Sequence, residues 1–305
     1  MMRAFFIWLS ESQSIRAVAE RSRIGNRLSR RFVAGMTVEE ALEATAAVNQ
    51  LGMSVSVDNL GENVTNADEA RHSAGLYHEM IDAITARKLE ANVSLKLTHM
   101  GLDVDESLAS GITRELVAHA ARTGNFVRVD MEGSPYTQKT LDVVRELHSE
   151  PDHRGVVGAV IQSYLHRSES DVRELCAEGI RIRLCKGAYK EPASIAFQAK
   201  ADVDANFVAL VKIMLESGTY HGIATHDPKM IEATVAFARE KKIDPESFEF
   251  QMLYGIRRDL QQQLVRDGWR MRVYIPFGRE WYPYLMRRLA ERPANAIFIL
   301  KNLFR

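Results

Sequence analysis

The chain has 305 residues, of which 46% are hydrophobic and 26% charged, and its 40 basic residues balance 40 acidic ones. This apolar content is enough for a packed core and excludes disorder as the main state, and the length suits one large domain or two small ones. A net charge of zero argues against a general nucleic-acid-binding protein, which needs a basic surplus to neutralise phosphates.

Cysteine content and hydropathy indicate neither secretion nor a membrane span. Cys176 and Cys185 are too few for a disulfide framework and are expected as buried side chains in a reducing, cytoplasmic setting. No run of about 18 apolar residues is present, so no transmembrane helix is expected. Residues 1–35 carry seven arginines against two glutamates and include the apolar segment Phe5–Trp8. This mixture suits a helix on a membrane surface, such as the inner face of the cell membrane, or against a partner, and equally a helix that packs on the barrel itself.

From residue 50 onward, short β-branched segments alternate with longer amphipathic ones. The expected strands are 53–57, 91–97, 126–129, 156–161, 180–184, 222–225, 248–253 and 270–275. The expected helices between them are 68–87, 107–122, 137–147, 169–178, 191–216, 228–241 and 255–267. Eight β/α units indicate a closed (β/α)₈ barrel of the TIM type rather than an open dinucleotide-binding sheet, because no G-x-G-x-x-G follows the first strand. Residues 1–49 are expected as an N-terminal helical extension and residues 50–305 as the barrel.

Polar side chains occur where the expected strands end, and the active sites of such barrels lie at those carboxyl ends. Lys96 and Asp130 stand in otherwise apolar strands, where an unpaired charge is costly, so we expect them to form an ion pair. The histidines are scattered, and His226 has no second histidine at ligand spacing, so no metal site is predicted. His99 and His221 are expected as surface or hydrogen-bonded side chains.

Lys96 also admits a different chemistry. A desolvated lysine has a lowered pKa and can form a Schiff base with a carbonyl substrate, as in barrel aldolases. A nearby Asp130 opposes this, because it would hold the amine protonated. A barrel aldolase or lyase that uses Lys96 therefore stays an alternative, as does a barrel that binds an anionic metabolite without catalysis.

A basic segment, W-Y-P-Y-L-M-R-R-L-A-E-R-P, follows the last expected strand at residues 281–293. Tyr284, Arg287, Arg288 and Glu291 have the spacing of one helical face. Two adjacent guanidinium groups can clamp a carboxylate through bidentate hydrogen bonds, although such a face is also common on solvated helices. Because the segment follows the eighth strand, we expect a C-terminal helix over the active-site end of the barrel.

Several longer motifs occur in a characteristic order: VSLKLT, VRVDMEGS, VIQSYL, RIRLCKGAYKEP, ATHDP, FEFQMLYG, VYIPFG and YLMRRLAERPAN. In these motifs the chain resembles the proline dehydrogenases from about residue 50 to its C-terminus, and is most similar to their monofunctional bacterial type. The resemblance implies a distorted (β/α)₈ barrel that binds FAD non-covalently and oxidises L-proline to Δ1-pyrroline-5-carboxylate. This reaction is the first step of proline catabolism to glutamate, and the electrons would pass to a membrane quinone.

The same resemblance implies roles for individual residues. Asp130, paired with Lys96, and Arg183, beside the flavin N5, match the catalytic positions. Glu62 matches a gating carboxylate that pairs with Arg287 when substrate is bound. The positions that match the proline site are Lys96, Tyr189, Leu253, Tyr274, Tyr284, Arg287, Arg288 and Glu62. The positions that match FAD contacts are Met131, Gln162, Arg183, Lys186, Gly187, Ala188, Thr225 and His226.

Overall fold

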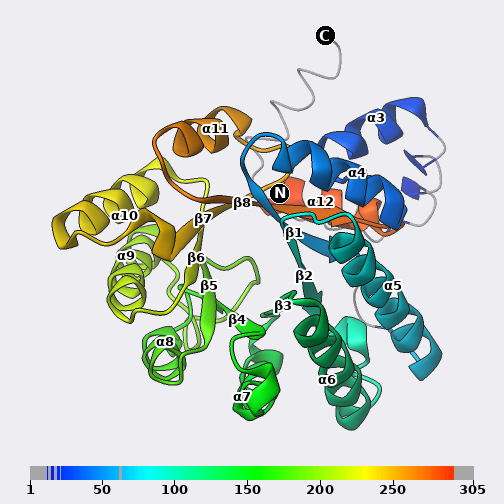
Figure 1. Cartoon of the computed structure of the whole chain (residues 1–305), viewed down its shortest axis with the longest axis horizontal. Helices are drawn as coiled ribbons and strands as arrows, with labels where there is room; N and C mark the ends of the chain where they lie inside the picture. The colour runs from blue at the N-terminus through cyan, green and yellow to red at the C-terminus, as the bar shows by residue number, and fades with distance from the viewer. Residues whose placement is uncertain (1–11, 13–14, 17–18, 21, 62–63, 292–305) are drawn as a thin grey trace.

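The computed structural model describes residues 12, 15–16, 19–20, 22–61 and 64–291 (Figure 1). Its eight parallel strands form a closed barrel in which each strand pairs with the next and β8 pairs with β1. The strands are β1 Ser54–Asn59, β2 Ala91–Lys96, β3 Val127–Asp130, β4 Val157–Gln162, β5 Arg181–Cys185, β6 His221–Ala224, β7 Phe248–Leu253 and β8 Met271–Phe277. Each predicted strand overlaps an observed one, and the predicted TIM-type barrel is confirmed.

Helices surround the barrel and connect its strands (Figure 1). They are α3 Arg23–Phe32, α4 Val38–Asn49, α5 Ala67–Ala86, α6 Glu106–Thr123, α7 Ser134–Ser149, α8 Ser168–Ala177, α9 Lys200–Glu216, α10 Pro228–Lys241, α11 Arg258–Arg266 and α12 Trp281–Glu291. Among the described residues, no helix combines the length and the apolar character that crossing a bilayer requires. Phe5–Trp8, the segment expected to contact a membrane or the protein itself, lies outside the described residues.

Two helices begin later than the sequence predicts. Residues 191–199 form a loop before α9, which a bridge between Leu165 and Ala196 attaches to the segment after β4. Pro192 has no N–H to donate and disfavours a helical residue before it, which weakens a helix at this point. Gly255 has a φ of +76°, a left-handed conformation that cannot continue into a helix, so α11 starts at Arg258.

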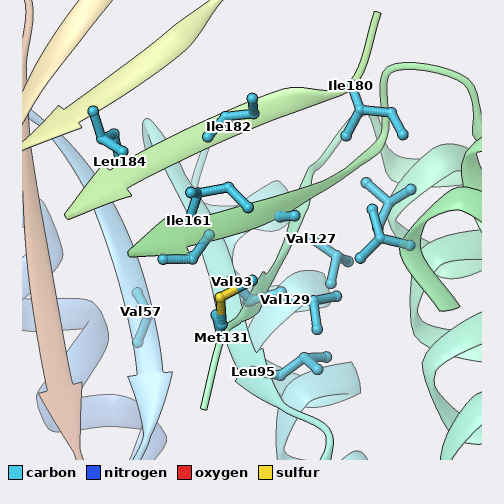
Figure 2. Close-up of a cluster of buried hydrophobic side chains, with 14 of the residues drawn as sticks. Val57, Val93, Leu95, Val127, Val129, Met131, Ile161, Ile180, Ile182 and Leu184 are labelled. Carbon is cyan, nitrogen blue, oxygen red and sulfur yellow. The ribbon is translucent and has the colours of Figure 1, made fainter. Parts of the chain in front are cut away.

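One face of each strand is apolar and packs against the helices. Figure 2 shows this layer, in which Val57, Val93, Leu95, Val129 and Ile182 are fully buried. The helices contribute their own buried side chains to the same cluster, which includes Tyr77, Met80, Leu116, Val144 and Phe207. Burying each such side chain contributes about 1.5–3 kcal/mol to the free energy of folding. The hydrophobic core of this fold therefore lies between the barrel and the helices around it.

The alternate strand positions face the barrel interior, and on β1, β2, β3 and β5 most of them are polar or charged. Contacts across the barrel establish this orientation, because Tyr274 on β8 and Arg183 on β5 both bind Asp130 on β3. Nearer the amino ends of the strands, Arg272 donates to Glu249 at 2.6 Å and to the Asn92 side chain at 2.8 Å. Barrels of this type are usually filled with bulky branched side chains, so a charged interior is a departure from the common pattern.

The last helix covers the carboxyl end of the barrel, as predicted. Trp281, Tyr282, Tyr284, Leu285 and Met286 of α12 form a second apolar cluster with residues of α3 and of the turn after β1, namely Phe32, Val33 and Leu60. The chain leaves β1 at its carboxyl end, so this cluster fixes α12 beside the strand ends that carry the polar side chains.

Gly158 on β4 provides a test of the packing inside the barrel. A Cβ atom at this position would lie 2.4 Å from the backbone oxygen of Arg181 and 2.8 Å from Arg128 Nη1. We expect Gly158→Ala to lower the free energy of unfolding by about 1–3 kcal/mol, because backbone and a buried guanidinium must move. The control is Gly111→Ala in α6, where no atom lies within 4 Å of an added Cβ and the Tm should stay the same or rise. An unchanged Tm for Gly158→Ala would contradict this packing.

Candidate active site

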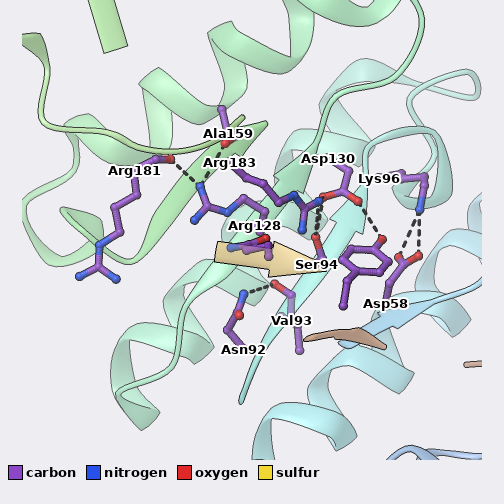
Figure 3. Close-up of polar contacts among 12 residues, drawn as sticks. Asp58, Asn92, Val93, Ser94, Lys96, Arg128, Asp130, Ala159, Arg181 and Arg183 are labelled. Atoms are coloured by element: carbon purple, nitrogen blue, oxygen red, sulfur yellow. Dashed lines mark hydrogen bonds and ion pairs between the residues drawn. The ribbon is translucent and has the colours of Figure 1, made fainter. Parts of the chain in front are cut away.

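Asp130, the last residue of β3, is the centre of a hydrogen-bond network at the carboxyl end of the barrel (Figure 3). Its Oδ1 accepts from Ser94 Oγ on β2 and from Arg183 Nη2 on β5, and its Oδ2 accepts from Tyr274 Oη on β8 at 2.9 Å. The Arg183 guanidinium also lies over the Tyr274 ring, 4.9 Å from its centroid. One buried carboxylate therefore fixes the relative positions of side chains from three other strands.

The protonation states in this network follow from burial and from the charge on Asp130. Burial and the neighbouring carboxylates raise the pKa of Tyr274 well above its usual value, so the phenol keeps its proton and donates it. Burial opposes the charge on Arg183, but the adjacent Asp130 raises the pKa of the guanidinium. Within the part of the chain that the structure describes, Arg183 Nη1 is buried without a hydrogen-bond partner. A buried donor without an acceptor is costly, so this nitrogen marks a place where a ligand acceptor fits.

Lys96, the last residue of β2, forms its ion pair with Asp58 of β1 and not with Asp130 (Figure 3). Its Nζ lies 3.1 and 3.2 Å from the two Asp58 oxygens. The predicted Lys96–Asp130 pair is therefore wrong, because Arg183 binds Asp130 and a second carboxylate is present on β1. Burial raises the pKa of Asp58, and the charge of Lys96 opposes that shift. The pairing favours a charged Lys96, which disfavours the Schiff-base alternative.

Gln162, the last residue of β4, joins the turns after β3 and β5. Its Nε2 donates to the Glu132 backbone oxygen at 3.0 Å, and its Oε1 accepts from the Ala188 N–H at 3.3 Å. Gly187 has a φ of +114°, and a Cβ there would lie 2.2 Å from Tyr164 Cδ1. Only glycine fits this turn, because any side chain would clash with the Tyr164 ring. The backbone of residue 187 therefore lies close to the carboxyl end of the barrel.

Ion pairs connect the turns after β5 and β6. Lys186 Nζ contacts Asp204 at 2.5 Å and Asp227 at 2.7 Å, so the lysine ties α9 to the start of α10. His226 Nε2 accepts a hydrogen bond from the Leu253 N–H at 2.9 Å, which attaches the same turn to the end of β7. These contacts place two of the predicted cofactor residues and one predicted substrate residue on neighbouring strand ends.

Arg288 and Tyr284 lie together on α12. The Arg288 guanidinium is 5.3 Å from the Tyr284 ring centroid. Burial raises the pKa of the Cys185 thiol to about 11, and the charge of Arg288 is among those that oppose this shift. Cys185 ends β5, so Arg288 lies near the carboxyl end of the barrel. Glu62 and the Arg287 side chain are outside the described residues, and the gate between them stays a prediction.

The other predicted site residues lie at the same end of the barrel with different exposure. Met131 and Thr225 are buried, Leu253 is half-buried, and 42% of Tyr189 is exposed. The sequence interpretation missed Ser94 as a partner of Asp130 and Asp58 as the partner of Lys96. A signal for both was present, because polar residues recur at every second position of Ser54–Asp58 and of Asn92–Lys96.

His99 and His221 are buried and hydrogen-bonded. The His99 Nε2 lies 2.8 Å from Ser73 Oγ, and the His221 Nδ1 accepts from the Ile182 N–H at 3.0 Å. Burial lowers the pKa of His99 to about 4 and that of His221 to about 3, so both are neutral at pH 7. Among the described residues, no three His, Cys, Asp or Glu side chains are arranged to hold a metal ion.

Comparisons with known proteins show the family of this chain. The sequence profile of the family described as proline dehydrogenase matches residues 41–301. Proline dehydrogenase 1 of Bacillus subtilis subsp. natto is 40% identical over 306 residues, which cover 100% of both chains. Proline dehydrogenase of Deinococcus radiodurans is 39% identical over 305 residues, which cover 96% of this chain and 97% of the relative.

Solved structures show the same architecture. The structure of proline utilization A (PutA) from Bdellovibrio bacteriovorus, inactivated by N-propargylglycine, superposes with a TM-score of 0.83 and 28% identity over 90% of this chain. The chain covers 34% of that PutA chain, so it spans about a third of the length of the longer protein.

The Asp58–Lys96 pair can be tested by removing one or both charges. Asp58→Asn removes the carboxylate from a lysine side chain that is only 14% exposed. We expect the free energy of unfolding to fall by about 3 kcal/mol, because a largely buried charge loses the carboxylate 3.1 Å from it. Adding Lys96→Met removes the remaining charge and should recover most of the loss in chemical unfolding. Equal losses in the single and double variants would contradict the pairing.

Proposed function

This chain belongs to the proline dehydrogenase family, and on that premise we propose that it binds FAD at the carboxyl end of the barrel, beside the site for proline. The enzyme oxidises proline to Δ1-pyrroline-5-carboxylate. The observation that supports the FAD site best is Arg183 Nη1, a buried donor for which the described residues supply no acceptor. When bound, the flavin supplies the redox chemistry, and the protein has to bind, orient and polarise the reactants.

The proposed FAD residues come from the ends of four successive strands. Met131 follows β3, Gln162 ends β4, Arg183 and the Lys186–Ala188 turn belong to β5 and its loop, and Thr225 and His226 follow β6. Because these strands are neighbours in the closed barrel, the residues line one continuous arc. The glycine at 187 leaves backbone accessible there, and the Arg183 charge would favour the anionic reduced cofactor.

The substrate carboxylate would be held by cations from two elements, β2 and α12. Lys96 reaches it from β2 while Asp58 fixes the ammonium, and Arg288 reaches it from α12, together with Arg287. The carboxylate is the group of proline that a protein can bind most strongly. Adjacent guanidinium groups suit it, because they bind a carboxylate through bidentate hydrogen bonds. The walls of the slot for the ring would be Tyr189, Leu253, Tyr274 and Tyr284.

Asp130 acts by holding its neighbours in place. It fixes Tyr274 against the ring slot and Arg183 at the proposed flavin position, so its role is to maintain the relative geometry of the two reactants. Oxidation would move a hydride from C5 of proline to the bound flavin while the amine lone pair forms the C=N bond, so the amine must be neutral in the reacting complex. Closing the proposed Glu62–Arg287 gate would exclude water from this step.

A membrane quinone is our proposal for the electron acceptor. It is supported by the resemblance to the family and by the sequence of the N-terminal segment. There the apolar run Phe5–Trp8 occurs among seven arginines in residues 1–35, a composition suited to an anionic lipid surface. The enzyme would then contact the inner face of the cell membrane peripherally while the barrel stays in the aqueous phase.

The visible spectrum of the purified protein tests cofactor and substrate together. We expect a yellow protein with a flavin band near about 450 nm that bleaches when L-proline is added without oxygen. A yellow protein that does not bleach would contradict the proposed proline site. A colourless protein that takes up no added FAD would overturn the flavin assignment.

Arg288→Lys tests the carboxylate clamp. A lysine keeps the charge but loses the bidentate geometry, so we expect KM for proline to rise by roughly tenfold while FAD content changes little. Arg173→Lys, on the exposed side of α8, is the matched control and should leave KM unchanged. Loss of flavin with an unchanged KM would refute the role of Arg288 in binding the carboxylate.

A further inference from the structure

The loop between β5 and α9, residues 186–199, carries three of the proposed FAD residues and Tyr189. Residues 187–190 are exposed, and Tyr189 is one of the few large apolar side chains with more than a third of its surface accessible among the described residues. Contacts that restrain the backbone of such a loop also restrict the orientations that its side chains adopt. The contact made by Glu191, two residues later, is therefore informative.

Glu191 binds the first residue of α7 with both carboxylate oxygens. Its Oε1 accepts from the Ser134 N–H at 2.7 Å, and its Oε2 accepts from Ser134 Oγ at 2.6 Å. The N-cap of α7 is Gly133, which has no side chain, and the first turn of this helix contains no acidic residue. A carboxylate from 57 residues further along the chain thus takes the place of the missing cap, where the helix dipole favours negative charge.

Tyr189 lies against the N-cap of the same helix. A Cβ on Gly133 would lie 3.6 Å from Glu191 Oε1 and 3.9 Å from Tyr189 Cδ1, so the ring and the carboxylate approach the same glycine. Gly133 is three residues after Asp130, the centre of the active-site network. The Glu191–Ser134 contact therefore joins the loop that carries Tyr189 to the start of α7, the helix that follows the strand ending in Asp130. The neighbouring hydrogen bond, from the Ala188 N–H to Gln162 Oε1, is longer at 3.3 Å.

We propose that Glu191 is a positioning residue that restrains the 186–199 loop at the start of α7 and so holds Tyr189 over the proline site. This inference rests on the proposed place of Tyr189 in the substrate pocket. A loop released from Ser134 samples orientations in which the ring is away from the site. Substrate then binds only to the fraction of molecules with the ring in place, which raises the apparent dissociation constant.

Steady-state kinetics with Glu191→Ala measure this effect. We expect KM for proline to rise about three- to tenfold with kcat little changed, because the variant lowers the population of the competent loop and not the chemistry. Glu191→Gln should restore most of the affinity, since its amide oxygen still accepts from the Ser134 N–H. Glu169→Ala, an exposed glutamate in the first turn of α8, is the matched control and should not change KM. An unchanged KM in Glu191→Ala would overturn the proposal.

A double-mutant cycle separates positioning of Tyr189 from a general loss of helix stability. In a Tyr189→Ala background, Glu191→Ala should raise KM no further, because the ring that it positions is gone. If the two increases multiply, Glu191 acts through another part of the protein and the proposal is wrong.

Hydrogen exchange gives a readout that does not depend on flavin or turnover. We expect Glu191→Ala to accelerate amide exchange in residues 187–198 while the second half of α7 exchanges as before. Faster exchange confined to α7 would mean that Glu191 only caps that helix, which would overturn the proposal. Failure of the proposed function would appear separately, as an enzyme that lacks flavin or does not bleach with proline while the loop exchange still changes.

Discussion

The carboxylate of Asp130 is the constraint on which the active-site end of this barrel depends. It is buried and shared by the guanidinium of Arg183 and the hydroxyls of Ser94 and Tyr274, which belong to three different strands. A buried carboxylate is tolerated only when charge and hydrogen bonds compensate it, so none of these partners can move alone. The relative positions of β2, β3, β5 and β8 at the carboxyl end are therefore fixed by one charged group as well as by the sheet.

This arrangement is possible because the apolar core that stabilises the fold and the polar groups of the site lie on opposite faces of the strands. The apolar side of each strand packs under the helices, where Figure 2 shows the buried aliphatic layer. The barrel interior can therefore contain charged side chains. One layer of them surrounds Arg272 and Glu249, and a second surrounds Asp130. The groups that would meet proline and flavin belong to the second layer, at the carboxyl ends of the strands.

Elements outside the barrel complete the site. The α12 helix places Arg288 and Tyr284 over the strand ends, held by the apolar cluster with Phe32 and Leu60. From another direction, Glu191 joins the β5–α9 loop to α7. Oxidation of a small, compact substrate needs accurate placement more than many reactive groups, and these long-range contacts supply it.

The sequence by itself determined the architecture and the family. The alternation of β and α segments predicted eight strands close to the positions that the structure shows. The motifs identified the family whose profile matches residues 41–301. Only the tertiary structure decided the partners, pairing Lys96 with Asp58 and leaving Asp130 to Arg183. It also showed residues 191–199 as a loop with Glu191 bound to a distant helix. Local patterns report periodicity and turn chemistry, whereas the partner of a buried charge depends on which side chains several strands bring into one interior.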